Sequence, residues 1–196
     1  MNKFYIISLL IFSFFSCENI DKKSENESIK KNDFGIENMP NNETEYDTIF
    51  TKNSNDNQKL ISEIENKLLK SKFRFEKNES IKQNSYNNCE ENTIILVKGD
   101  GIRNYFAKSL VPEKNSPMKN VYPDFMITVY EFENENIANK NFEIIYNALF
   151  SAGHFCNGKA PEKLVQNGNE IFHLSTRAEM FRTYIEKYGE LIKNYR

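Results

Sequence analysis

The sequence predicts an α+β domain: a two-layer sandwich of about four mainly antiparallel strands with helices on one face, preceded by a disordered tether. Residues 93–97 and 124–132 have the β-branched and aromatic character of buried strands. Apolar residues recur at helical spacing in three segments: 56–69, 135–152 and 176–195. Residues 18–55 are polar, with isolated apolar residues and no sustained period, which is typical of a segment that cannot bury a core.

The strands are defined by their faces and their flanking turns. Residues 93–97 form a short apolar run that ends at Gly99-Asp100-Gly101, and these glycines predict a turn because a phosphate loop would need a longer motif. Residues 124–132 have apolar side chains on both faces, which predicts a central strand. Residues 102–111 fit either a helix or an irregular strand, and residues 76–92 are interpreted as a polar connection.

The helices and the last hairpin follow from caps and turn residues. Asp56 or Asn57 caps the first helix, whose apolar face is formed by Leu60, Ile61, Ile64, Leu68 and Leu69. Asn134 caps the second helix. The last helix begins at Thr176, which forms a capping box with Glu179. Between these helices, Asn167-Gly168 predicts the turn of a hairpin spanning residues 164–174.

Composition limits the classes of partner. The chain has 196 residues, enough for one domain and a tail. Its formal net charge is −2 and it has no basic stripe interleaved with aromatic residues, which argues against nucleic acid as a partner. It has no Trp, but 16 Phe and 10 Tyr can supply an aromatic core.

The first seventeen residues have the pattern of an export signal. Lys3 precedes an uncharged run from Phe4 to Ser16, and Cys17 follows at once. The run is too short to cross a hydrocarbon core of roughly 30 Å, and it has the basic, apolar and small-residue order of a secretory signal. A cysteine directly after the small residue Ser16 resembles the lipoprotein signals of the Bacteroidota. The alternative is an ordinary cysteine near a cleaved signal.

The resemblance covers residues 1–17 only, and the rest of the chain matches no family that we can name. It implies that residues 1–16 are removed and that Cys17 carries a diacylglyceryl thioether and an amide-linked acyl chain such as palmitate. These chains would anchor the protein in the cell envelope, on the periplasmic or the surface side of the outer membrane. Residues 17–55 would be the tether and residues 56–196 the single domain. Asp47-Thr48-Ile49 resembles an O-glycosylation motif of the same bacteria, which makes Thr48 a candidate site.

Cys89 and Cys156 remain once Cys17 is lipidated. Two cysteines in an exported protein favour a disulfide. One alternative is a zinc site completed by His154 and His173, although the spacing matches no zinc pattern. The other is a cysteine nucleophile activated by one of these histidines. We therefore assign no metal ligands and no cofactor.

Charged residues give no convergent catalytic motif. Glu131 and Glu133 share a strand face and are interpreted as solvated surface carboxylates. Arg177, Glu179 and Arg182 lie near the start of the last predicted helix, and the arginines are interpreted as exposed or ion-paired rather than as an anion site. We therefore assign no catalytic residue.

The sequence thus favours a lipid-anchored envelope protein that is a binding module rather than an enzyme, with another envelope protein or a glycan as the partner. The alternatives are an envelope hydrolase with a His/Cys or carboxylate site, and a structural envelope protein.

Overall fold

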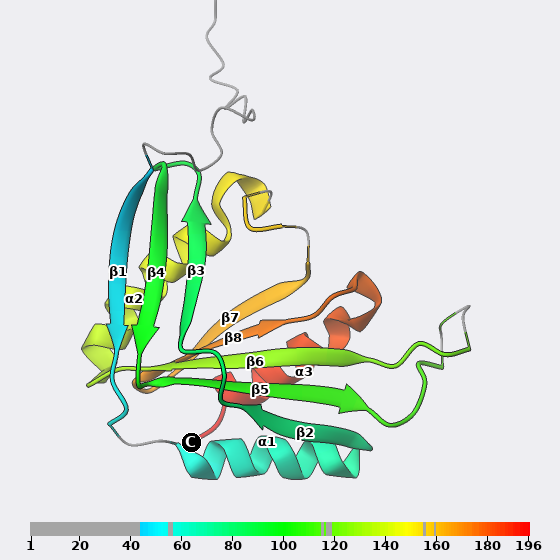
Figure 1. Cartoon of the computed structure of the whole chain (residues 1–196). Coiled ribbons are helices and arrows are strands. Elements are labelled where there is room, and N and C mark those ends of the chain that lie inside the picture. Colours follow the sequence, from blue (N-terminus) through cyan, green and yellow to red (C-terminus); the bar gives the residue numbers. More distant parts are fainter. Residues whose placement is uncertain (1–43, 55–56, 115, 117–118, 155, 159) are drawn as a thin grey trace, which may run out of the picture. The chain divides into compact units, whose positions relative to one another are not determined.

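Two sheets organise the part of the chain that the structure describes. This computed structural model describes residues 44–54, 57–114, 116, 119–154, 156–158 and 160–196. The fold is α+β (Figure 1). Its elements, in chain order, are β1 (Glu45–Thr51), α1 (Gln58–Lys70), β2 (Phe73–Asn78), β3 (Gln83–Asn88), β4 (Thr93–Gly99), β5 (Ile102–Ser109), β6 (Asp124–Glu131), α2 (Glu135–Leu149), the 3-10 turn η2 (Ser151–His154), β7 (Glu162–Asn167), β8 (Glu170–Ser175), the 3-10 turn η3 (Glu179–Phe181) and α3 (Arg182–Lys193).

The larger sheet has five antiparallel strands in the order β2-β5-β6-β8-β7. The prediction that residues 124–132 form a central strand is confirmed by β6. Its side chains alternate between two faces, so Phe125, Ile127 and Val129 join one core while Tyr130 joins another.

The smaller sheet has three strands in the order β1-β4-β3, with β1 parallel and β3 antiparallel to β4. The chain leaves this sheet for the larger one through the turn at residues 99–101. Gly99 has φ +136°, and a Cβ atom there would lie 2.2 Å from the carbonyl oxygen of Thr51. Glycine is therefore required by both conformation and space, which confirms the predicted turn and explains it.

Helices cover both faces of the larger sheet. Helices α1 and α3 pack on the face of Phe125 and Ile127, where Ile64 and Ile185 are fully buried. Helix α2 packs on the other face, between that sheet and the three-stranded sheet, through Ile145 and Leu149. Figure 1 shows α1 and α2 on opposite sides of β5 and β6. The prediction of one sheet with all helices on one face is therefore wrong, because the three-stranded sheet and α2 form a second core.

The missed strands lie in segments predicted to be polar. Strand β1 falls within the predicted tether of residues 17–55, and β2 and β3 account for most of residues 76–92. The ambiguous segment 102–111 is β5. Strands β1, β2 and β3 are all sheet edges, so each pairs on one side only, and each has at most three apolar side chains. Their sequences therefore lack the apolar run that identifies β4.

Caps and turns decide where several of the predicted elements begin and end. The first helix is confirmed, with the Asn57 side chain capping the Leu60 amide. The last helix begins at Arg182 rather than Thr176, because the Thr176 hydroxyl donates to the Asp124 carbonyl at 2.6 Å instead of capping a helix. The hairpin is confirmed, but its two-residue loop is Gly168-Asn169, and only the glycine has positive φ, as in a type II′ turn.

Candidate functional site

One end of the five-stranded sheet is left uncovered by α2 and the three-stranded sheet, on the face away from α1 and α3. We call this surface the open face. Because side chains alternate along each strand, the register places one row of partly exposed residues across all five strands: Glu76, Phe106, Met126, Ser175 and Glu162. A second row lies beside it: Arg74, Lys108 and Asp124. In Figure 1 the open face is the end of β5 and β6 that extends past β3.

A cavity of about 340 Å³ lies over the first row. Phe106 and Met126, from neighbouring strands, form its apolar floor. Glu162 lines it at one end, and Arg177 lines it where it pairs with Asp124, with Nε and Oδ1 3.0 Å apart. An apolar floor bordered by a few polar groups is the usual composition of a small-ligand site.

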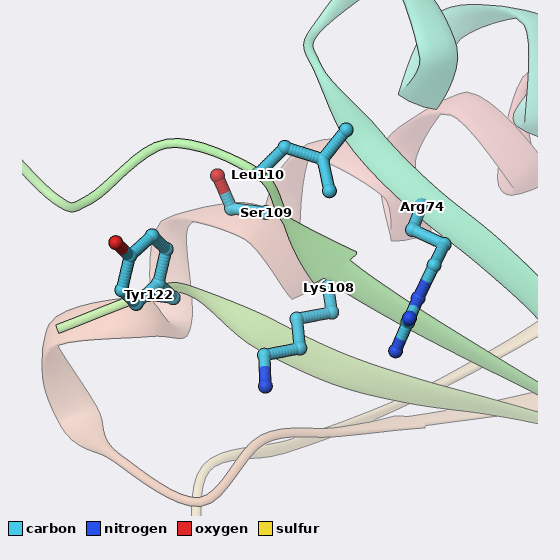
Figure 2. Close-up of a pocket in the computed structure, with 5 residues that line it drawn as sticks. All are labelled: Arg74, Lys108, Ser109, Leu110 and Tyr122. Carbon is cyan, nitrogen blue, oxygen red and sulfur yellow. The ribbon is translucent and has the colours of Figure 1, made fainter.

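A second cavity, of about 300 Å³, lies over the second row (Figure 2). Arg74 and Lys108 are directly opposite each other in the β2–β5 register, and Tyr122 and Leu110 supply apolar lining. Figure 2 shows the charged ends of Arg74 and Lys108 extending in the same direction, away from Leu110. The only charged side chains that line this cavity are therefore two cations.

The cations of this second cavity differ in their partners. Arg74 Nε lies 3.0 Å from Glu76 Oε1, so part of its charge is offset by this carboxylate. Lys108 makes no ion pair with any acidic residue in the described ranges, and its neighbour across the strands, Asp124, pairs with Arg177. The positive charge of Lys108 is consequently not neutralised locally.

A buried hydrogen-bonded network lies between the open face and the three-stranded sheet. Tyr86 and Tyr130 share a short hydroxyl–hydroxyl hydrogen bond, and the Asn84 amide donates to the Tyr130 hydroxyl at 2.7 Å. Tyr86 also contacts His173 Nδ1 at 2.9 Å. Burial raises the pKa of Tyr130 to about 12 and that of Tyr86 well above its ordinary value. Both phenols therefore stay protonated at neutral pH and position groups by hydrogen bonding rather than acting as bases.

Glu162 connects this network to the first cavity. Its Oε1 lies 3.4 Å from His173 Nε2, and the two atoms are not hydrogen-bonded. His173 Nε2 has no hydrogen-bond partner among the described residues, although the side chain is buried. Glu162 thus lies beside the histidine and also lines the cavity.

A separate ion cluster lies on the opposite face of the same sheet. Arg103 pairs with Glu131 at 2.6 Å and with Glu170, and both carboxylate side chains are 1% exposed. Backbone amides of Ser54 and Asn57 donate to these two carboxylates. The interpretation of Glu131 as a solvated surface carboxylate is therefore wrong, whereas its predicted companion Glu133 is exposed and pairs with Lys52. The cluster ties the β1–α1 connection to the sheet and is closed to solvent.

The two cysteines of the domain are joined to each other. Cys89, after β3, and Cys156, after η2, form a disulfide with Cα atoms 6.0 Å apart, a separation typical of such bonds. Neither sulfur is therefore available in this structure as a nucleophile or a zinc ligand. His173 contacts Tyr86 and Glu162 instead, and the side chain of His154 lies outside the described part. In the described ranges, no three His, Cys, Asp or Glu side chains gather in an arrangement that would hold a metal ion.

The other residues that the sequence suggested as lipidation, glycosylation or anion-binding sites lie in separate places. Cys17 and the signal segment lie outside the described residues. Thr48 lies in the middle of β1, opposite Leu96 of β4 and partly exposed. Arg177 and Arg182 are both ion-paired, with Asp124 and Glu179 respectively. Within the described part of the chain, no helix has the length and apolar character of a membrane span.

A second uncovered surface lies on the outer side of the three-stranded sheet. Tyr46 and Phe50, both on the edge strand β1, are 71% and 67% exposed. The Lys98 amino group lies 5.0 Å above the Phe50 ring. This surface therefore presents exposed aromatic rings with a cation over one of them.

Sequence reasoning did not find Arg74 and Lys108, since it assigned no strand to residues 73–78. The available signal was the alternation Phe73-Arg74-Phe75-Glu76, which is typical of a half-buried strand. The alternation predicts that Arg74 and Glu76 share a face, but only the register of β2 with β5 brings Lys108 beside Arg74.

Comparison of the chain with models of known families, with curated proteins and with solved structures finds no match.

Proposed function

We propose that this protein is a lipid-anchored lipoprotein of the cell envelope, held by Cys17, and that its domain is a binding module whose ligand lies on the open face. The observation that carries the binding function is the pair of adjacent cavities over two rows of one uncovered sheet face. An apolar floor with cations beside it offers both contact area and orientation to a ligand.

The disulfide supports the location. Disulfides persist in oxidising compartments such as the periplasm or the cell surface and are rare in the cytosol. The Cys89–Cys156 bond is buried at both ends and links the end of β3 to the segment after α2. A domain of this kind fits an exported protein, which is what the resemblance of residues 1–17 to a lipoprotein signal implies.

The anchor is tested by fractionation of cells that produce the wild type or Cys17→Ala. We expect the wild type in the membrane fraction and, because the acyl chains are lost, Cys17→Ala in the soluble fraction. Membrane association that survives Cys17→Ala would refute the assignment of Cys17. Protease treatment of intact cells then reports on which side of the outer membrane the domain lies.

The binding surface is tested by photocrosslinking in intact cells. A photoreactive residue at Lys108 probes the open face, one at Phe50 probes the outer side of the three-stranded sheet, and one at Glu65 is the control on the exposed side of α1. We expect a specific adduct from Lys108 and none from Glu65. Adducts from Phe50 alone would move the binding surface to the three-stranded sheet and contradict the assignment of the open face.

A further inference from the structure

We infer that the ligand of the open face is an amphiphilic anion: a molecule that places an acidic group between Arg74 and Lys108 and an apolar group on Phe106 and Met126. This inference rests on the proposed binding function of the open face and specifies its ligand chemistry.

The acidic group follows from the charges around the second cavity. Its two charged lining residues are Arg74 and Lys108. The neighbouring carboxylates already have cations of their own, since Glu76 pairs with Arg74 Nε at 3.0 Å and Asp124 pairs with Arg177 at 3.0 Å. Lys108 is left without a carboxylate partner among the described residues, and Arg74 lines the same cavity, so the two cations can reach one anionic group from two sides.

The apolar group follows from the spacing along β5. Phe106 and Lys108 are two residues apart on the same face of the strand, a separation of about 7 Å. Met126 lies directly opposite Phe106 on β6, so the two apolar side chains form a continuous floor next to the cationic pair. A ligand with an acidic group and an apolar group a few bonds apart would contact both rows at once.

Glu162 bounds the site at its far end. Glu162 lines the first cavity and lies beside His173. Its carboxylate is on β7, three strands away from Lys108 on β5. An anionic group is therefore favoured at the β2–β5 end of the open face and disfavoured at the β7 end. The sheet thus orients the ligand with its acidic end toward Arg74.

The small size of the ligand follows from the two cavities. They measure about 300 and 340 Å³, at the lower end of the range of about 300–1,000 Å³ for small-molecule sites. An acidic group of this kind can be a carboxylate or a phosphate monoester, and the structure favours neither.

The test uses the methyl group of Met126 as a local reporter. Full-length protein carrying isotope-labelled methionine methyl groups is titrated with 3-phenylpropionate, with phenyl phosphate and with the neutral 3-phenylpropanamide. We expect saturable shifts of the Met126 resonance, with at least one anion binding about tenfold more tightly than the amide. The comparison of the two anions separates the carboxylate from the phosphate source.

The variant Arg74→Gln/Lys108→Gln should weaken binding of the anion about tenfold and leave binding of the amide unchanged. Lys59→Gln, at an exposed position of α1, is the matched control and should change neither. Equal affinities for anion and amide, or an anion affinity that the double substitution does not alter, would overturn the inference.

Failure of this inference can be separated from failure of the binding function. If none of the probes shifts Met126 but Lys108 still crosslinks to a macromolecule in cells, the open face binds a partner and the amphiphilic anion is wrong. If Met126 does not respond and Lys108 gives no adduct, both proposals are wrong.

Discussion

Replacement of Arg103 by methionine should destabilise the fold by about 3–5 kcal/mol, the usual cost of removing one partner from a buried ion pair. Arg103 pairs with Glu131 at 2.6 Å and with Glu170, and all three side chains are at least nine-tenths buried. Without the guanidinium, two carboxylates remain in a low-dielectric site and retain only their hydrogen bonds to other groups, such as the Ser54 and Asn57 amides. Methionine fills much of the same volume, so the loss reports on charge rather than on a cavity.

The matched control is Arg177→Met, which removes a single ion pair with Asp124 in which the arginine is solvent-exposed. The Arg177 side chain is 62% exposed, and such pairs contribute about 0–1 kcal/mol. Urea denaturation of the wild type and both variants, followed by circular dichroism, gives the three free energies of unfolding. If Arg103→Met costs no more than Arg177→Met near neutral pH, the cluster is not a buried ion pair and the reasoning is refuted.

The pH dependence provides a second check of the same cluster. Burial raises the pKa of Glu170 above its ordinary value although Arg103 opposes the shift, so removal of Arg103 should raise this pKa further. A carboxyl whose folded pKa is raised contributes stability that is present below its unfolded pKa and lost as pH rises through the folded pKa. The deficit of Arg103→Met should therefore shrink as pH falls from about 7 toward about 4. Additional Glu131→Gln and Glu170→Gln substitutions should restore part of the lost stability at neutral pH. A deficit that stays constant with pH would contradict the assignment to buried carboxylates.

Three further predictions test other parts of the fold. Serine at both Cys89 and Cys156 should lower the free energy of unfolding by about 4 kcal/mol in the chain-entropy model, given the separation of 67 residues, and a loss below 1 kcal/mol would contradict a native disulfide. Ile64→Ala, in the core under α1, should cost about 2–5 kcal/mol, whereas Leu69→Ala on the same helix, 55% exposed, should stay within about 0.5 kcal/mol. Spectrophotometric titration should show phenols with a pKa of about 12, since burial stabilises the neutral form of Tyr130 and of Tyr184. Tyr130→Phe should remove one of them and leave that of Tyr184, and the stability that depends on Tyr130 is lost as pH rises from about 10 through about 12. An unchanged titration curve in Tyr130→Phe would refute the assignment.

Sequence reasoning identified the strands that have a clear local signal, including β7 and β8, which flank the predicted turn at Asn167-Gly168. β4 has the continuous apolar run Ile94-Ile95-Leu96-Val97, and β6 has apolar residues on both faces because it is central in its sheet. The edge strands β1, β2 and β3 were missed, because each has few apolar residues and lies in a polar stretch of the chain that resembles a loop. The open face was missed for the same reason, since Arg74 belongs to β2.

The residues of the candidate site show the same division. The alternation of Phe73 and Phe75 with Arg74 is local information, but the neighbour of Arg74 is decided by pairing with a strand some thirty residues later in the chain. Glu131 looked like an exposed carboxylate, since the partner that buries it lies on β5 and its second acidic neighbour lies on β8. Contacts of this kind depend on register, and a one-residue shift would move each side chain to the other face.

The sequence by itself determined the α+β class, the three apolar helix faces, the strands with a clear local signal, the candidate lipid anchor at Cys17 and the even pair of cysteines left in the domain. These features depend on local periodicity and on residue chemistry, which a single segment contains in full. Only the tertiary structure decided that there are two sheets in the described part of the chain, that helices cover both faces of the larger one, and that one end of that sheet is left open with Arg74 beside Lys108. Those features depend on which strands pair and in what register, and that choice depends on the packing of the whole domain rather than on any one segment.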